Sequence, residues 1–133
     1  MKSLLTIFTL VFTVMFSSTS WGGWTKVTEG TASGNSGDTF YVDFERIRKH
    51  DGFVYYWYLS DYLKPEIGDL SVKNYNQGDC KLFRFKFLSK SFHKEPMGGG
   101  TGETPPLPEK YKIWVSVSPD STQGLILKSV CSR

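Results

Sequence analysis

Apolar side chains recur at every second position over residues 81–92, and this spacing constrains the fold more than any other feature of the chain. Phe83, Phe85 and Phe87 share one side of an extended segment, whereas Arg84 and Lys86 lie on the other side. Side chains of a β-strand point alternately to its two faces, so the pattern predicts a strand with one face in a hydrophobic core. A half-buried β-sheet is therefore the expected scaffold.

Further strands are predicted wherever β-branched and aromatic residues cluster between turn signals, at residues 24–27, 39–43, 53–62, 71–75 and 111–117. Residues 53–62 carry apolar side chains on both faces of the predicted strand, which indicates a central strand. Lys64-Pro65 should end that strand, because proline lacks the N–H donor of the ladder. Asp51-Gly52 is typical of a tight turn.

The connections are predicted from residues that do not pack. Residues 30–38 and 95–109 are rich in Gly, Ser or Pro and are expected to form loops. Residues 44–49 are expected to make one helical turn with Ile47 inward.

The C-terminal segment has helical spacing. Ile126 and Val130 are four residues apart, and Asp120 with Gln123 resembles a capping box. Together these patterns predict an α+β domain: an antiparallel β-sheet meander of about five to six strands, with a short C-terminal α-helix packed on it and one disulfide.

Residues 1–22 have the organisation of a secretory signal peptide. Lys2 precedes an apolar run over residues 4–16, which is too short for a bilayer span of about 20 residues, and Ser20 and Gly22 suit a cleavage site. We expect one domain over residues 23–133, without a membrane span. No cysteine lies near this junction, so no lipid anchor is expected.

Cys80 and Cys131 are the two cysteines of the chain. Export to an oxidising compartment favours a disulfide between them, whereas a zinc site requires more ligands and a redox pair requires Cys-x-x-Cys. Closing a loop of about 50 residues should contribute roughly 4 kcal/mol.

Groups for catalysis, metals or cofactors are not recognised in the sequence. His50 and His93 lack a partner pattern, and Asp43, Asp61 and Asp79 are better placed to cap turns. The net charge of +3 does not indicate a nucleic-acid partner. We predict no catalytic, cofactor or metal residues.

Aromatic and basic side chains suggest two surfaces for binding. Tyr56, Tyr58 and Tyr62 could form a stacking platform, although core and half-buried sheet positions explain most of these aromatic residues. A basic stretch could steer an acidic partner, although a solvated sheet face or a lysine-guarded edge strand would look the same. The candidate partner-binding residues of this stretch are Arg84, Lys86, Lys90 and Lys94.

Landmarks spread along the chain resemble the surface-adhesin protein E family of Gram-negative bacteria. They are Trp24-Thr25-Lys26-Val27, Phe40-Tyr41-Val42-Asp43, Ile47, Trp57-x-Leu59-x-Asp61-Tyr62, Ser71-Val72-Lys73, Asp79-Cys80, Arg84, Pro96-Met97-Gly98, Trp114 and Val130-Cys131. The resemblance implies an antiparallel sheet with a C-terminal helix, bridged cysteines, and adherence to host matrix and cells. The namesake of the family carries a lipid anchor, for which this chain has no acceptor cysteine.

The sequence therefore predicts an exported cell-envelope binding module that mediates protein–protein or extracellular-matrix adhesion. It would be periplasmic or secreted, with surface display as a further option. One alternative is a non-adhesive periplasmic protein that contacts another envelope component, and another is an enzyme of unrecognised type.

Overall fold

The structure is a computed structural model that describes residues 23–30 and 37–133. The signal peptide predicted for residues 1–22, and most of the loop predicted for residues 30–38, lie outside the described residues. Within the described part, no helix is both long and apolar enough to span a membrane.

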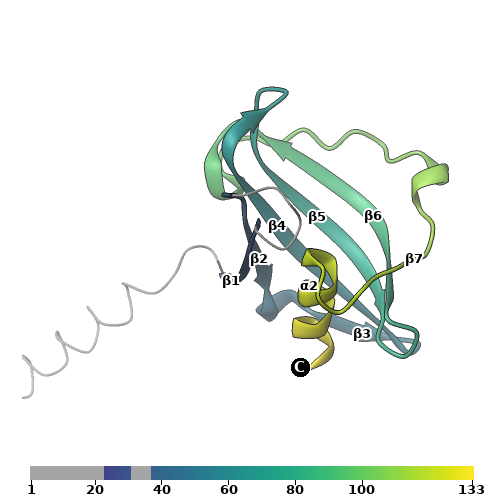
Figure 1. Cartoon of the computed structure of the whole chain (residues 1–133). Coiled ribbons are helices and arrows are strands. Elements are labelled where there is room, and N and C mark those ends of the chain that lie inside the picture. Colours follow the sequence, from purple (N-terminus) through teal and green to yellow (C-terminus); the bar gives the residue numbers. More distant parts are fainter. Residues whose placement is uncertain (1–22, 31–36) are drawn as a thin grey trace, which may run out of the picture.

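One antiparallel sheet organises the described residues, and a single α-helix packs on it (Figure 1). The strands are β1 (Trp24–Glu29), β2 (Thr39–Asp43), β3 (Arg48–His50), β4 (Phe53–Glu66), β5 (Asp69–Asp79), β6 (Arg84–His93) and β7 (Val115–Ser116). Their order is β1-β2-β4-β5-β6-β7, and β3 also pairs with β4. The helices are η2 (Phe44–Arg46), η3 (Pro96–Gly98), η4 (Glu109–Tyr111) and α2 (Thr122–Cys131).

These seven strands exceed the five to six that were predicted. The strand that the sequence did not reveal is β3, in which all three residues are exposed. It carries no alternation of apolar and polar side chains, because neither of its faces is buried.

The central strand is β4, as predicted, with β2 and β3 on one side and β5 on the other. The prediction that Lys64-Pro65 ends it was wrong, since β4 continues to Glu66. Pairing with β5 is interrupted between Asp61 and Glu66, so Pro65 occupies a stretch where no N–H donor is needed. The predicted turn at Asp51-Gly52 is confirmed by positive φ angles of 51° and 83°.

The β5–β6 hairpin corrects the prediction for residues 81–92 in two ways. Phe83 precedes β6 and lies in the turn, with a φ of +51°, although it still packs partly against the core. Further along, Asn76 pairs with Phe87 while Tyr75 pairs with Ser89, so Leu88 is an extra residue in β6. Such a bulge reverses the side to which later residues point.

The strand predicted for residues 111–117 shrinks to Val115 and Ser116 in β7, which pair with Phe85 and Arg84. Tyr111 belongs to η4 instead. Prolines in the preceding segment lack N–H donors, and only Glu103 forms an isolated bridge, with Phe92. The predicted long loop over residues 95–109 is otherwise confirmed, apart from η3.

Helix α2 covers one face of the sheet. Its buried residues Ile126, Leu127 and Val130 pack with Val54 and Tyr56 of β4 and with neighbouring core residues. The side chain of Ser121 caps the helix by accepting from Gly124 N at 3.0 Å, so the cap lies one residue after the predicted Asp120.

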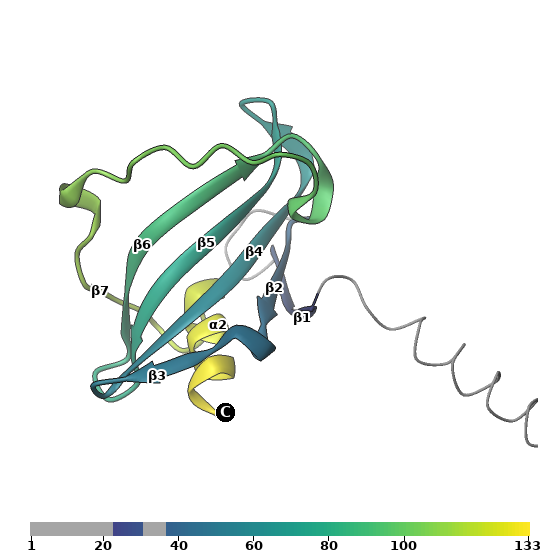
Figure 2. The ribbon, with the colours of Figure 1, turned by 180° about the vertical axis from the view of Figure 1, so that it is seen from behind.

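The predicted disulfide is present between Cys80 and Cys131, with an S–S distance of 2.06 Å. It joins the turn after β5 to the last residue of α2. Seen from behind, the sheet lies in front of α2, and this second face is covered at one end by η3, which packs on β4 and β5 (Figure 2).

Candidate functional site

The face of the sheet opposite α2 gathers aromatic and basic side chains, and we call it the open face. Val54, Tyr56 and Tyr58 point to the helix and are buried, so the alternating residues of β4 point the other way. The open face is defined by the side chains of Arg46, Phe53, Tyr55, Trp57, Tyr75, Arg84, Lys86 and Trp114. Each ring of this set is only partly buried.

One cluster of the open face centres on Tyr75 of β5. The Trp57 ring lies 4.8 Å from the Tyr75 ring, and the Tyr55 ring lies 6.5 Å from it on a roughly parallel plane. The guanidinium of Arg46, which follows β2, lies 5.2 Å from the centre of the Trp57 ring. Three strand-borne aromatic rings and one cation thus form a continuous surface.

A second cluster centres on Trp114, just before β7. The charged groups of Arg84 and Lys86 lie 4.5 Å and 4.6 Å from the centre of its ring, and the Phe53 ring lies 5.4 Å away. Cation–π contacts of this kind contribute about 0.5–1 kcal/mol each at exposed sites. Trp114 thereby extends the open face from β6 to the beginning of β4.

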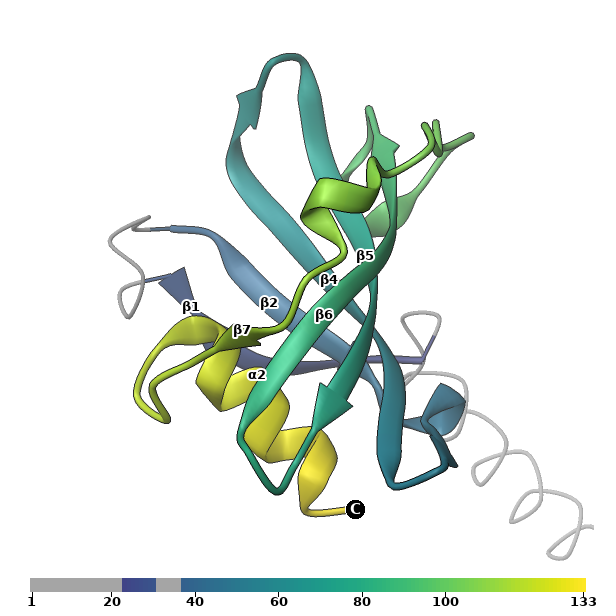
Figure 3. The same cartoon turned by 90° about the vertical axis from the view of Figure 1, so that its right-hand side faces the viewer.

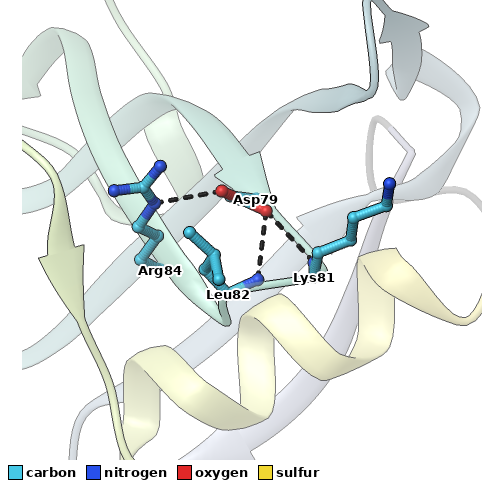
Figure 4. Close-up of polar contacts among 4 residues, drawn as sticks. All are labelled: Asp79, Lys81, Leu82 and Arg84. Atoms are coloured by element: carbon cyan, nitrogen blue, oxygen red, sulfur yellow. Dashed lines mark hydrogen bonds and ion pairs between the residues drawn. The ribbon is translucent and has the colours of Figure 1, made fainter.

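Arg84 is held in place by Asp79, at the turn that also carries Cys80 (Figure 4). The carboxylate of Asp79 accepts hydrogen bonds from Lys81 N at 3.1 Å, Leu82 N at 3.2 Å and Arg84 Nε at 3.0 Å. The bond from Leu82 N, assisted by the Arg84 guanidinium, lowers the pKa of the Asp79 carboxyl. Arg84 is therefore part of the turn as well as of the open face.

The four basic residues predicted as one binding stretch lie in three places. Arg84 and Lys86 are together on the open face, but the bulge at Leu88 turns Lys90 to the side of Phe87, towards α2. Lys94 follows β6 and forms an ion pair of 3.1 Å with Asp69.

Residues of the open face that sequence reasoning missed are Arg46, Trp57, Tyr75 and Trp114. Parity could have indicated Trp57, because it opposes the core-facing Val54 and Tyr56 in β4. Contacts of Trp114 with residues some 30 positions earlier left no local signal.

Tyr56 and Tyr58, which were considered for a stacking platform, lie in the core instead. Asn76 Nδ2 donates to the Tyr56 hydroxyl at 3.4 Å, and Gln123 Nε2 donates to the Tyr58 hydroxyl at 2.7 Å. Burial raises the pKa of Tyr56 to about 12. These tyrosines stabilise the domain and are not available to a ligand.

The two histidines differ in environment. His50 Nε2 lies 3.0 Å from the carboxylate of its neighbour Asp51, and both side chains are largely exposed beside an open groove of about 410 Å³. His93 is buried and bonds to Ser91 Oγ at 2.8 Å and to the Gly99 carbonyl at 3.1 Å. Across residues 23–30 and 37–133, no three His, Cys, Asp or Glu side chains gather as metal ligands.

The three aspartates act as capping groups. Asp43 Oδ1 accepts from Glu45 N at the start of η2, and Asp61 Oδ1 accepts from Met97 N at 2.7 Å, which holds η3 against β4. Asp79 organises the β5–β6 turn as described above. Their predicted role at turns is confirmed for Asp43 and Asp79, and Asp61 does the same for a segment distant in sequence.

Solved structures of Haemophilus influenzae protein E share this fold. One crystal form has a TM-score of 0.63 at 20% identity and covers 85% of this chain and 90% of that chain. A second structure has a TM-score of 0.61 at 20% identity, with 85% and 86% covered. Protein E from non-typeable Haemophilus influenzae has a TM-score of 0.59 at 19% identity, with 85% and 78% covered.

No curated protein sequence matches the chain at a significant level. The family model described as surface-adhesin protein E matches residues 24–132, which is nearly all of the described part. The chain therefore belongs to the surface-adhesin protein E family.

Proposed function

We propose that this protein is an exported adhesin-like binding module that holds a protein partner on its open face. The observation that carries the proposal is the partly exposed cluster of Trp57, Tyr75 and Tyr55, continued by Trp114 between two cations. Trp, Tyr and Arg dominate the binding energy of protein interfaces, because they bury large area and still offer polar contacts. Membership in a surface-adhesin family supports this function.

The charge of the open face favours an acidic partner. Arg46 of η2 and both Arg84 and Lys86 of β6 project onto the same face. Arg46, which is about half exposed, and Arg84 form ion pairs with Asp43 and Asp79, whereas no ion pair of the described residues involves Lys86. The unpaired charge of Lys86 would speed the encounter with an acidic surface. The aromatic rings would then supply most of the affinity after the encounter.

The proposal is tested with the purified exported protein on immobilised extracellular-matrix proteins, by biolayer interferometry. Trp57→Ala should weaken binding by about 30-fold, which corresponds to a hot spot of roughly 2 kcal/mol. Lys128→Ser is the matched control, because this exposed residue lies on α2, on the other side of the sheet. Absence of saturable binding to every matrix protein, or equal loss in both variants, would contradict the proposal.

Lys86→Ser tests the charge of the open face. It should lower the association rate at low salt and have little effect near 1 M salt, where charges are screened beyond about 3 Å. Arg84 is left unchanged because its loss would also disturb the Asp79 turn. An association rate that does not depend on Lys86 at low salt would mean that the partner docks elsewhere.

The cellular location separates adhesion from the alternative function within the envelope. An adhesin must be accessible from outside, so added protease should degrade the protein on intact cells. Protein confined to the periplasm and protected from protease would instead support contact with another envelope component.

A further inference from the structure

A second surface, distinct from the open face, lies along the edge of β6 that faces away from β5. Residues 103–116 run beside this strand and are attached to it at both ends, by hydrogen bonds between Phe92 and Glu103 and by pairing of Phe85 with Val115 (Figure 3). Between these attachments lies a groove of about 400 Å³, which we call the strap groove. It is lined by Phe87, Lys90, Leu107, Tyr111, Ile113 and Val115.

The walls of the strap groove are apolar and open to solvent. Tyr111, Ile113 and Val115 are 53%, 57% and 37% exposed, and they are among the most exposed large apolar residues of the described part. Exposed apolar side chains that converge on one groove mark binding sites more often than scattered ones do. A groove of this volume is within the usual range for small-molecule sites.

Lys90 is the one charged residue in the lining. Its Nζ donates to Asn74 Oδ1 at 2.8 Å and lies 3.9 Å from the centre of the Phe87 ring. Removal from water lowers the pKa of this amine to about 8. Among the ion pairs of the described residues none involves Lys90, so its ammonium lacks an anionic partner.

We infer that the strap groove binds an amphipathic carboxylate, such as a medium-chain fatty acid. The hydrocarbon chain would lie between Phe87 and the exposed side chains of residues 107–115, and the carboxylate would accept a hydrogen bond from Lys90 Nζ. An ammonium in an apolar setting is costly without a counter-charge, and the bound carboxylate provides one. Lys90 has donors to spare, because Asn74 takes only one of its three N–H groups.

This ligand chemistry is tested by NMR titration of the full exported chain with decanoate and with uncharged 1-decanol. Decanoate should shift the amide resonances of residues 87–90 and 107–115. Lys90→Met keeps the apolar stem but removes the charge, so it should weaken decanoate binding by about tenfold or more and change 1-decanol binding less than about twofold.

Two further variants make the outcome decisive. Ile113→Ser should weaken the binding of both ligands, because it removes part of the apolar wall. Lys128→Met, at an exposed position of α2 outside the groove lining, should change neither affinity. Lys90→Arg restores the charge and should recover decanoate binding, which excludes a folding defect as the cause. Absence of decanoate-induced shifts at the groove, or equal affinity of Lys90→Met and the unmodified protein for decanoate, would overturn the inference.

Discussion

Tyr55 and Tyr56 are neighbours in β4 and chemically identical, yet they lie in different environments. Tyr56 is fully buried against α2, whereas Tyr55 is partly exposed and stacks on Tyr75. Full burial of a large apolar side chain contributes about 1.5–3 kcal/mol, and an exposed aromatic pair contributes about 0.5–1.5 kcal/mol. One face of the strand therefore stabilises the domain, and the other keeps apolar area available for a partner.

The packing of α2, and not the sequence of β4, therefore decides which face of the strand stabilises the domain and which face is available to a partner. Both faces of β4 are rich in aromatic residues, but only one is covered by Ile126, Leu127 and Val130. The open face carries cations against its rings, at Trp57 and Trp114, while the covered face carries hydrogen bonds to the tyrosine hydroxyls. A matched set of substitutions can separate stability from binding.

The largest effect is expected from the two tyrosines themselves. Tyr56→Ala should lower the free energy of unfolding by about 3–5 kcal/mol, because it leaves a cavity beneath α2. Tyr55→Ala should lower it by no more than about 1 kcal/mol, since only a partly exposed ring pair is lost. Urea denaturation of both variants measures the difference, and similar losses for the two would refute the division of roles between the faces.

Removing the disulfide that fixes the end of α2 should also lower the free energy of unfolding. Cys131→Ser removes the bond to Cys80 and should cost about 2–5 kcal/mol, because the unfolded chain is no longer constrained by the loop of 51 residues. Ser132→Ala is the control at the next position. Thermal unfolding under non-reducing conditions reports the loss, and a midpoint like that of the control would show that packing alone holds α2.

Lys90 lies on the side of the sheet that faces α2, and its titration should make the free energy of unfolding depend on pH. Its pKa of about 8 in the folded protein lies below the value of 10.5 for a free lysine, so the folded protein releases this proton first as the pH rises. The unfolded chain then binds more protons, and the free energy of unfolding should increase between pH 8 and 10. We expect a gain of about 2 kcal/mol, allowing for the part of the side chain still in water.

Urea denaturation at pH 7 and pH 9.5 measures this increase in the free energy of unfolding. Lys90→Met should be more stable than the unmodified protein at pH 7 and should lose the rise, while Lys86→Met should keep it. The window ends near pH 10, because the raised pKa of Tyr56 then makes the free energy of unfolding fall with pH. If the free energy of unfolding of Lys90→Met still increases with pH, a group other than Lys90 is responsible for the increase.

A smaller effect than that of Tyr56→Ala is expected at the start of α2, where the helix propensity of the residue and its packing favour different side chains. Alanine is favoured over glycine in helices by about 1 kcal/mol, but a Cβ on Gly124 would lie 1.9 Å from the Ser118 carbonyl oxygen. Gly124→Ala should therefore destabilise the protein by about 1–3 kcal/mol. Lys128→Ala, at an exposed position of the same helix, should be neutral or stabilising, and a stabilising Gly124→Ala would show that the loop at Ser118 yields freely.

Local patterns were good predictors where one face of an element is buried and the other is not. The bounds of β2 and the burial of Ile126 and Val130 follow from such alternation and spacing. Predictions failed where pairing depends on distant segments: Pro65 is tolerated in an unpaired part of β4, and Tyr111 is kept out of a strand by the course of residues 103–114.

In the candidate site, too, the predictions failed where the position of a side chain depends on pairing with another strand. Arg84 and Lys86 were correctly placed opposite Phe85 and Phe87, because no irregularity separates them. Lys90 was grouped with them by sequence proximity, but one extra residue at Leu88 moves it to the other face. A bulge is created by the register with β5 and has no signature in β6 alone.

By itself, the sequence determined that aromatic strands alternate, that one helix ends the chain, and that a single pair of cysteines can close a disulfide. The tertiary structure alone decided which face of β4 is core, where Lys90 points, and that Trp114 lies between Arg84 and Lys86. Alternation has a period of two residues but does not say which side is inside. That choice depends on α2, which packs on β4 from more than 60 residues away along the chain.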